Sequence, residues 1–203
     1  LDGGMADTCL VAAETIVPLP TGIDPGDASL VEPLAVGAPA VRLAGSLADA
    51  AGVVLGGGSI GLCLVPALQA VGMGVDLIAR HPHQVAAAER LGARPVAAAP
   101  GRWDVVFDAV GTAESLAQAV DMVRSGGRVV IVGMYWDGTV AMPGMAFCMK
   151  EVRLIAAMMY GCARMCNRSQ TTIVTGTTSM MIVTLSRIGE AMAVISISMT
   201  ISR

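Results

Sequence analysis

The chain has 203 residues, a formal net charge of −3, 54% hydrophobic residues and 14% charged residues. A weakly acidic chain without a basic cluster excludes nucleic acid as a partner. Residues 51–75 contain no charged side chain, and this stretch is long enough for a membrane span. Its many glycines and Pro66 instead favour turns and strands buried on both faces, so we expect no membrane segment.

The cysteines indicate a reducing compartment. Five of them are scattered along the chain, without the paired spacing of a metal site. An odd number of isolated thiols is typical of cytosolic proteins, and the first residues show no secretory signal. We therefore expect a cytoplasmic protein.

The first forty residues predict short strands followed by two helices. Residues 5–20 hold apolar stretches interrupted by prolines, which favour strands. Asp24 and Pro25 indicate a helix start, and a second helical pattern covers residues 36–43. Glu32 has apolar neighbours, but burial of an unpaired carboxylate is costly, so the residues alone favour an exposed glutamate.

A glycine-rich turn follows the apolar residues 53–55 and precedes an apolar helical pattern. Gly56, Gly58 and Gly61 fit G-x-G-x-x-G, in which the first glycine permits the turn, the second lets a pyrophosphate approach, and the third lets helix and strand pack closely. The helix N-terminus offers N–H groups to the phosphates. Ser59 is interpreted either as a hydroxyl donor to a phosphate or as a helix cap.

Strands and helices alternate through residues 52–160. This predicts an α/β fold, a doubly wound parallel sheet of the Rossmann type. Ligands bind such sheets at the carboxyl ends of the strands, so Gly56, Ala79, Gly111 and Gly133 should face one crevice. The other expected strands cover residues 75–79, 95–98, 103–111, 128–133 and 152–158, and the expected helices cover residues 84–91 and 113–123.

Residues 162–203 differ in composition from the rest of the chain. They are rich in Ser, Thr, Met and Ile and hold a single acid, Glu190. Neither helical periodicity nor a hairpin register is clear in them. We interpret the segment as an atypical tail, either out-of-frame or disordered, and assign it no fold.

Together these motifs resemble the medium-chain, zinc-type alcohol and polyol dehydrogenases, in particular the sorbitol and threonine dehydrogenase branch, over residues 3–161. The resemblance implies hydride transfer between a nicotinamide cofactor and a small alcohol or carbonyl substrate. It also implies that residues 1–40 are the remnant edge of a catalytic (GroES-like) domain, and that residues 41–161 form the Rossmann domain. A homodimer through the edge strand near residues 152–158 is implied as well. The motifs that carry the resemblance are Gly3-Gly4-Met5-Ala6-Asp7, Leu30-Val31-Glu32-Pro33-Leu34-Ala35-Val36, residues 56–61, Leu91-Gly92-Ala93, residues 106–111, residues 126–133 and Lys150-Glu151-Val152-Arg153-Leu154.

The departures from the family pattern concern zinc. In the family, the zinc-binding cysteine and a histidine–glutamate pair precede the Gly-Gly motif with which this chain begins. Glu32 matches a glutamate beside the catalytic zinc, but one residue cannot hold a metal that needs three protein ligands. His81 and His83 are interpreted as solvated residues or as neighbours of a cofactor phosphate. We therefore expect zinc in the full-length parent, no catalytic residue in this chain, and a chain that is inactive alone.

The choice of cofactor depends on the end of the second strand, where NAD-specific proteins place an acid that binds the ribose hydroxyls. By the resemblance, that position is Ala79, and Arg80 follows it; this pair leaves room for a 2′-phosphate and supplies a cation, which favours NADP over NAD. The alternative is a solvated Arg80 with Asp76 in the role of the acid, although Asp76 should point to the opposite face of the strand. By the same resemblance, the other cofactor contacts are Ile60, Gln84, Val110, Gly111, Val132, Gly133 and Met134.

Other functions stay open at this point. Methyltransferases that use S-adenosylmethionine share the glycine-rich first turn, but they also need an acid where this chain has Ala79. A zinc-free quinone reductase relative and a non-catalytic nucleotide-binding fragment are further alternatives. Binding without turnover would support the non-catalytic fragment, and turnover by the isolated chain would contradict it.

Overall fold

A computed structural model describes residues 13, 18–24, 26–136, 139–157, 180–188 and 192–200, the last two ranges as backbone only. The chain divides into two compact units, residues 36–159 on the one hand and residues 1–35 with 160–203 on the other. Of residues 5–20, in which strands were expected, only residues 13 and 18–20 are described, and none of these lies in a strand. The other residues of that range and Pro25 lie outside the described residues.

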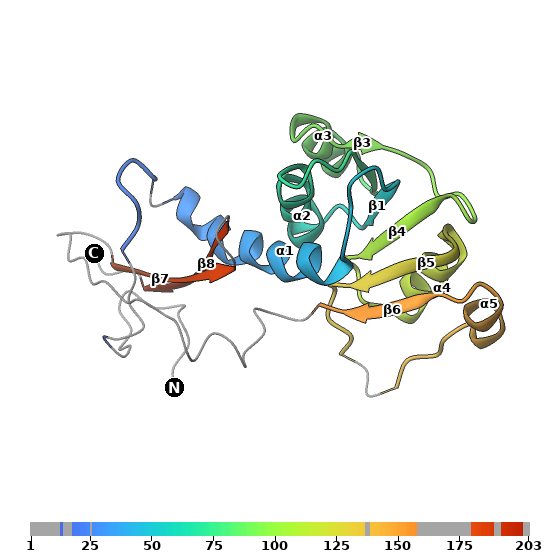
Figure 1. The fold of residues 1–203 in the computed structure, drawn as a ribbon. Coiled ribbons are helices and arrows are strands. Elements are labelled where there is room, and N and C mark those ends of the chain that lie inside the picture. The colour runs from blue at the N-terminus through green and yellow to red at the C-terminus, as the bar shows by residue number, and fades with distance from the viewer. Residues whose placement is uncertain are drawn as a thin grey trace. The chain divides into compact units, whose positions relative to one another are not determined.

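The larger unit is built on a sheet of six parallel strands in the order β3-β2-β1-β4-β5-β6 (Figure 1). At the carboxyl end of β1, Leu55 pairs with Ile78 on one side and with Asp108 on the other. The strand order therefore reverses direction between β1 and β4, which confirms the predicted doubly wound sheet. The strands are β1 (Gly52–Leu55), β2 (Val75–Ile78), β3 (Arg94–Pro95), β4 (Trp103–Asp108), β5 (Val123–Ile131) and β6 (Arg153–Ala156).

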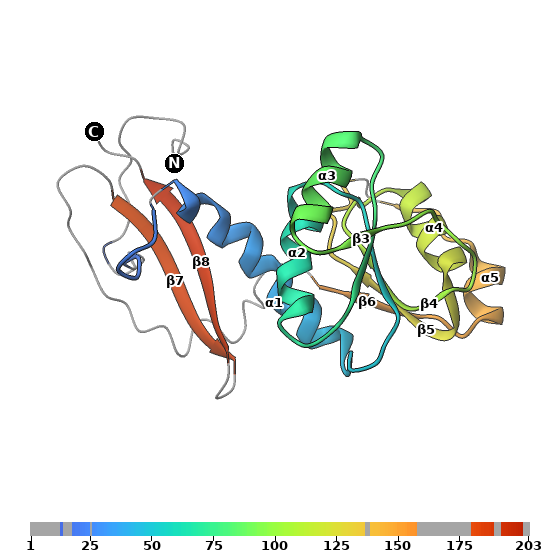
Figure 2. The same cartoon turned by 90° about the horizontal axis from the view of Figure 1, so that it is seen from above.

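Helices cover both faces of this sheet (Figure 2). Alternate strand residues face opposite layers: Val54 belongs to one apolar cluster and Val53 to the other, and both are fully buried. Burial on both faces explains why the strand sequences are continuously apolar. The first cluster lies under α1 (Val31–Ala44), α2 (Ser59–Gln69) and α3 (Pro82–Arg90), and the second lies under α4 (Ala113–Met122) and α5 (Gly144–Met149).

Side chains satisfy both ends of α4. At its start, Thr112 Oγ1 accepts from the N–H of Ser115 (3.1 Å), and Ser115 Oγ accepts from the N–H of Thr112 (2.9 Å). At its end, Lys150 Nζ donates to the carbonyls of Val120 (3.0 Å), Asp121 (2.6 Å) and Val123 (3.1 Å). The single lysine of the chain therefore binds the negative end of this helix.

Several predicted boundaries are wrong; the strand expected over residues 128–133, for example, is β5 and already begins at Val123. Two of the differences have a local cause. Instead of two helices over residues 24–43, a short 3-10 helix, η2 (Asp27–Leu30), leads into the single helix α1. Pro33 lies in the first turn of α1, where N–H groups have no helical partner, so it does not end the helix. Strand β4 ends at Asp108 rather than at Gly111, because the Asp108 carboxylate accepts from the following N–H groups and turns the chain.

In the segment to which we assigned no fold, the described residues form an antiparallel pair. Strand β7 (Met180–Ile188) pairs with β8 (Met192–Thr200), with Thr184 opposite Ser196 at the centre of the register. Among the described helices, none has both the length and the apolar character needed to cross a membrane.

Candidate functional site

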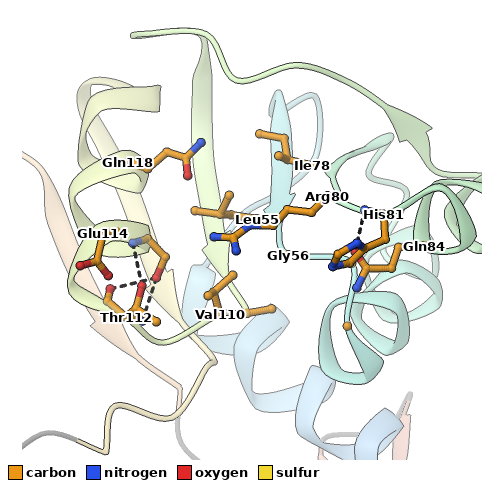
Figure 3. Close-up of a pocket in the computed structure, with 14 residues that line it drawn as sticks. Leu55, Gly56, Ile78, Arg80, His81, Gln84, Val110, Thr112, Glu114 and Gln118 are labelled. Carbon is orange, nitrogen blue, oxygen red and sulfur yellow. Dashed lines mark hydrogen bonds between the residues drawn. The ribbon is translucent and has the colours of Figure 1, made fainter.

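A cavity of about 410 Å³ opens at the carboxyl ends of β1, β2 and β4 (Figure 3). It lies where the strand order reverses, which is where doubly wound sheets bind their ligands. Three segments form its walls: the glycine turn after β1, the β2–α3 connection, and the β4–α4 turn with the start of α4. Among the residues proposed from the sequence, Gly56, Gly58, Arg80, Gln84 and Val110 line this cavity.

The glycines of the turn are required for different reasons. Gly56 has a φ of +107°, which L side chains rarely adopt, and its own carbonyl oxygen would lie 1.8 Å from a Cβ added at Gly61. The third glycine therefore lets α2 begin directly against the turn. Gly58 differs, because a Cβ there would meet no atom within 4 Å and would project into open space. This open space beside the cavity and the N-terminus of α2 suits a phosphate group.

Gly57 also shapes the site, although the sequence analysis did not single it out. A Cβ at this buried position would lie 2.8 Å from the Cβ of Ala79 and 2.9 Å from the Cβ of Gln84. Gly57 therefore lets the end of β2 and the first turn of α3 approach the glycine turn. The unbroken Gly56–Gly58 run was the available signal.

The end of β2 presents a cation to the cavity and no carboxylate. In Figure 3, Arg80 points into the cavity across the end of β1. Asp76 is only 7% exposed and does not line the cavity. Its Oδ1 accepts from Arg94 Nε (2.8 Å) and pairs with Arg94 Nη2 (2.7 Å), and its Oδ2 accepts from Trp103 Nε1 (2.9 Å). The Asp76 carboxylate is thus bonded to side chains of β3 and β4, on the face of the sheet opposite to Ala79.

The histidines lie beside Arg80, at the start of α3. The His81 and His83 rings stack with their centroids 5.5 Å apart, and the N–H of His81 is 3.4 Å from Oε1 of Gln84. His81 and Gln84 line the cavity. Within the described part of the chain, no group of three or more histidine, cysteine or acidic side chains could hold a metal ion. The donor set that zinc requires is therefore not assembled by the described residues.

On the opposite wall, a fully buried carboxylate organises the β4–α4 turn. Asp108 Oδ1 accepts from the N–H groups of Val110 (2.9 Å) and Gly111 (3.3 Å). Its Oδ2 accepts from Ser115 Oγ (2.8 Å) and from the hydroxyl of Tyr135 (2.6 Å). The sequence analysis missed this network, although an acid at the end of a buried strand, directly before Ala109-Val110-Gly111, was a signal for it.

The start of α4 adds an acid to this wall. Glu114 lines the cavity, and hydrogen bonds from its own backbone N–H and from the Thr112 hydroxyl lower the pKa of its exposed carboxyl. The cavity therefore has a cationic side at Arg80 and an anionic side at Glu114.

The remaining proposed residues do not line the cavity. Gly111 has a φ of +81°, and a Cβ added there would lie 2.6 Å from the carbonyl oxygen of Met134. A Cβ at Gly133 would lie 2.5 Å from the N atom of Gly111. These glycines are thus needed for backbone packing between two loops, which is a different reason from cofactor contact. Glu32 lies half-buried in the first turn of α1, and its place beside a zinc ion stays a prediction. The residues outside the cavity lining are Ser59, Ile60, Gly61, Gly111, Val132, Gly133 and Met134.

The strand order, the glycine turn and the crevice at the reversal point together define a Rossmann-type dinucleotide-binding fold. Comparison with known proteins identifies the family. The chain matches the zinc-binding dehydrogenases over residues 59–173, more than half of its length, and it belongs to that family. This match continues past residue 161, where the resemblance that we inferred from motifs ended.

Individual relatives agree with this assignment. The chain is 30% identical to a 2-dehydro-3-deoxy-L-galactonate 5-dehydrogenase of Pseudoalteromonas atlantica over 79% of its own length and 51% of the relative. It is 33% identical to an L-galactonate-5-dehydrogenase of Escherichia coli over 66% of the chain and 43% of the relative. The chain therefore spans about half the length of these relatives.

Solved structures show the same fold. A protein from Sinorhizobium meliloti, described as a zinc-binding dehydrogenase and solved with NADP bound, superposes with a TM-score of 0.63 and 30% identity. The superposition covers 69% of this chain and 46% of that protein. Because the matched family and these relatives are dehydrogenases, the methyltransferase alternative is not favoured.

Proposed function

We propose that this chain is the cofactor-binding part of an NAD(P)-dependent dehydrogenase that acts on a small alcohol, polyol or carbonyl compound, and that it prefers NADP(H) to NAD(H). The observation that carries the proposal is the position of Arg80. Its side chain points into the cavity beside the glycine turn, while Asp76, the nearest acid on β2, is bound to Arg94 and Trp103. A guanidinium whose own strand presents no carboxylate to the cavity suits a 2′-phosphate.

In this proposal, different residues of the crevice bind different parts of the cofactor. The open space at Gly58 and the N-terminus of α2 receive the pyrophosphate, and Arg80 binds the 2′-phosphate. Val110 and the loop after β5 lie toward the nicotinamide half, because dinucleotides extend across the point where strand order reverses. The bound nicotinamide supplies the hydride acceptor or donor.

We infer that zinc, where the full-length protein uses it, is held mainly by residues outside this chain. The described residues assemble no group of three or more metal-ligating side chains, and the relatives are about twice as long as the matched region. Glu32 is proposed as a neighbour of that zinc rather than as a sufficient ligand set. The chain alone should therefore bind the cofactor without turning over substrate.

Calorimetric titration of the 203-residue chain with NADPH and NADH tests the proposal. NADPH should bind more tightly than NADH, and Arg80→Ala should abolish the difference. A hydrogen bond to a charged group contributes about 1.5–3 kcal/mol, so the expected loss in NADPH affinity is about tenfold or more. Arg90→Ala removes an exposed arginine from the last turn of α3, outside the cavity lining, and is the matched control. Equal affinities for both cofactors would contradict the NADP preference, and binding of neither would contradict the whole proposal.

We propose two further properties. The edge position of β6, together with the 38% exposure of Leu154, supports a homodimer formed through this strand, which light scattering would detect.

Cys148 carries a free thiol at the surface, which supports a reducing, cytoplasmic location. A fluorescent fusion of the full-length protein would test that location.

A further inference from the structure

The loop after β5 is bonded to the buried carboxylate of Asp108. The Tyr135 hydroxyl donates to Asp108 Oδ2 over 2.6 Å. The same carboxylate accepts from the N–H of Val110 in the β4–α4 turn and from Ser115 Oγ at the start of α4. A single buried side chain thus joins the loop after β5 to the β4–α4 turn and the start of α4.

Backbone contacts hold the first part of this loop against the same turn. The N–H groups of Val132 and Gly133 both donate to the carbonyl oxygen of Asp108 at 2.8 Å. A Cβ at Gly133 would lie 2.5 Å from the N atom of Gly111, so the two loops are in direct backbone contact. Two residues further along the chain, Tyr135 bonds to the Asp108 side chain, so Met134 lies between two residues that are both bonded to Asp108.

The position of this loop determines which part of a dinucleotide it can reach. In a doubly wound sheet, one nucleotide lies over each half of the sheet. The glycine turn and Arg80 belong to the β1–β2 half, whereas residues 132–135 follow β5 in the other half. Neither Tyr135 nor residues 132–134 line the cavity itself, so their influence would be on the part of a dinucleotide that extends beyond the cavity toward β5.

We propose that Tyr135 is a positioning residue that, through its bond to Asp108, holds residues 132–134 in place for the nicotinamide half of the cofactor. This inference rests on the proposed function. Burial, followed by the hydrogen bond and the charge of Asp108, raises the pKa of Tyr135, so its hydroxyl remains a donor in neutral solution. Loss of the hydroxyl should leave Val132 and Gly133 held only by their backbone bonds and loosen Met134, without altering the site of the 2′-phosphate.

Comparison of a whole cofactor with one of its fragments tests this. The full chain and Tyr135→Phe are titrated with NADPH and with 2′,5′-ADP, which carries the 2′-phosphate but no nicotinamide. Tyr135→Phe should weaken NADPH about tenfold and leave 2′,5′-ADP unchanged, because a loop released from Asp108 has to be ordered again when the nicotinamide half binds. The fluorescence of bound NADPH should shift toward that of free NADPH. Trp136→Phe, at a neighbouring side chain that is 86% exposed, should change neither affinity.

A second variant tests whether displacement of this loop, and not a general loss of structure, lowers the affinity for NADPH. Gly133→Ala displaces the same loop by a different contact, and it should reproduce the selective loss of NADPH affinity. Two results for Tyr135→Phe would overturn the role of Tyr135 while leaving the proposed function intact: equal weakening of both ligands, or an unchanged affinity for NADPH. If the unaltered chain binds neither ligand, the proposed function fails and this inference fails with it.

Discussion

Alanine substitutions at Gly58 and Gly61 should separate cofactor binding from folding. Gly58 has a φ of −76° and a ψ of −176°, an extended conformation that alanine adopts readily, and its added Cβ would meet no atom within 4 Å. Alanine is a poorer helix cap than glycine but restricts the unfolded chain, so the free energy of unfolding should change by less than about 1 kcal/mol. At Gly61 the added Cβ would lie 1.8 Å from the backbone oxygen of Gly56, and the resulting displacement should cost about 1–3 kcal/mol.

Gly58→Ala should change stability little but should weaken cofactor binding strongly. Its new methyl group would occupy the space proposed for the pyrophosphate and hold the phosphate oxygens away from the N–H groups of α2. Loss of one such charged hydrogen bond, about 1.5–3 kcal/mol, weakens NADPH by about tenfold or more. Urea unfolding followed by circular dichroism gives the stabilities, and calorimetry gives the affinities. A Gly58→Ala variant that binds NADPH like the unaltered chain would refute the role given to this glycine.

Two other predictions concern stability. Lys150→Met keeps the length of the side chain but removes three donors from the end of α4, so the free energy of unfolding should fall by about 1–2 kcal/mol. Lys150→Arg keeps a charged donor and should retain part of this stabilisation. Equal stability of the unaltered chain and both variants in urea would contradict the capping role. The pKa of Tyr135 is raised in the folded protein, so the stability that its neutral hydroxyl contributes is fully present below the ordinary tyrosine pKa of about 10 and is lost as the pH rises through the higher folded value. Between pH 9 and pH 11 the unaltered chain should therefore lose stability more steeply than Tyr135→Phe, and parallel curves would show that Tyr135 does not titrate as described.

The part of the fold that could be predicted is the part whose signal is local. The turn at Gly56–Gly61 is visible because buried strand residues precede it and an apolar helix follows it, and the sheet order follows from the alternation of such units. Arg80 could be placed through the family resemblance, which assigns the position of the ribose-binding acid to Ala79, directly before it. The limits proposed for residues 1–40, 41–161 and 162–203 stay predictions.

The parts that could not be predicted depend on contacts between distant residues. Tyr135 and Asp108 are 27 positions apart, and nothing in the sequence near Tyr135 indicates that its hydroxyl turns toward a buried carboxylate. Lys150 is 27 positions from Val123, whose carbonyl it binds. A second helix was expected to begin at residue 36, but α1 continues unbroken through Pro39, and Ala40 and Val41 are buried in the first apolar cluster.

The most direct test of the proposed function is a crystal structure of this chain with NADPH. We expect the pyrophosphate beside Gly58 at the N-terminus of α2, the 2′-phosphate on the Arg80 guanidinium, and the nicotinamide toward the loop that contains Gly133 and Met134. A cofactor bound elsewhere on the molecule, or a crevice that stays empty at saturating NADPH, would contradict the proposal that this crevice is the dinucleotide site.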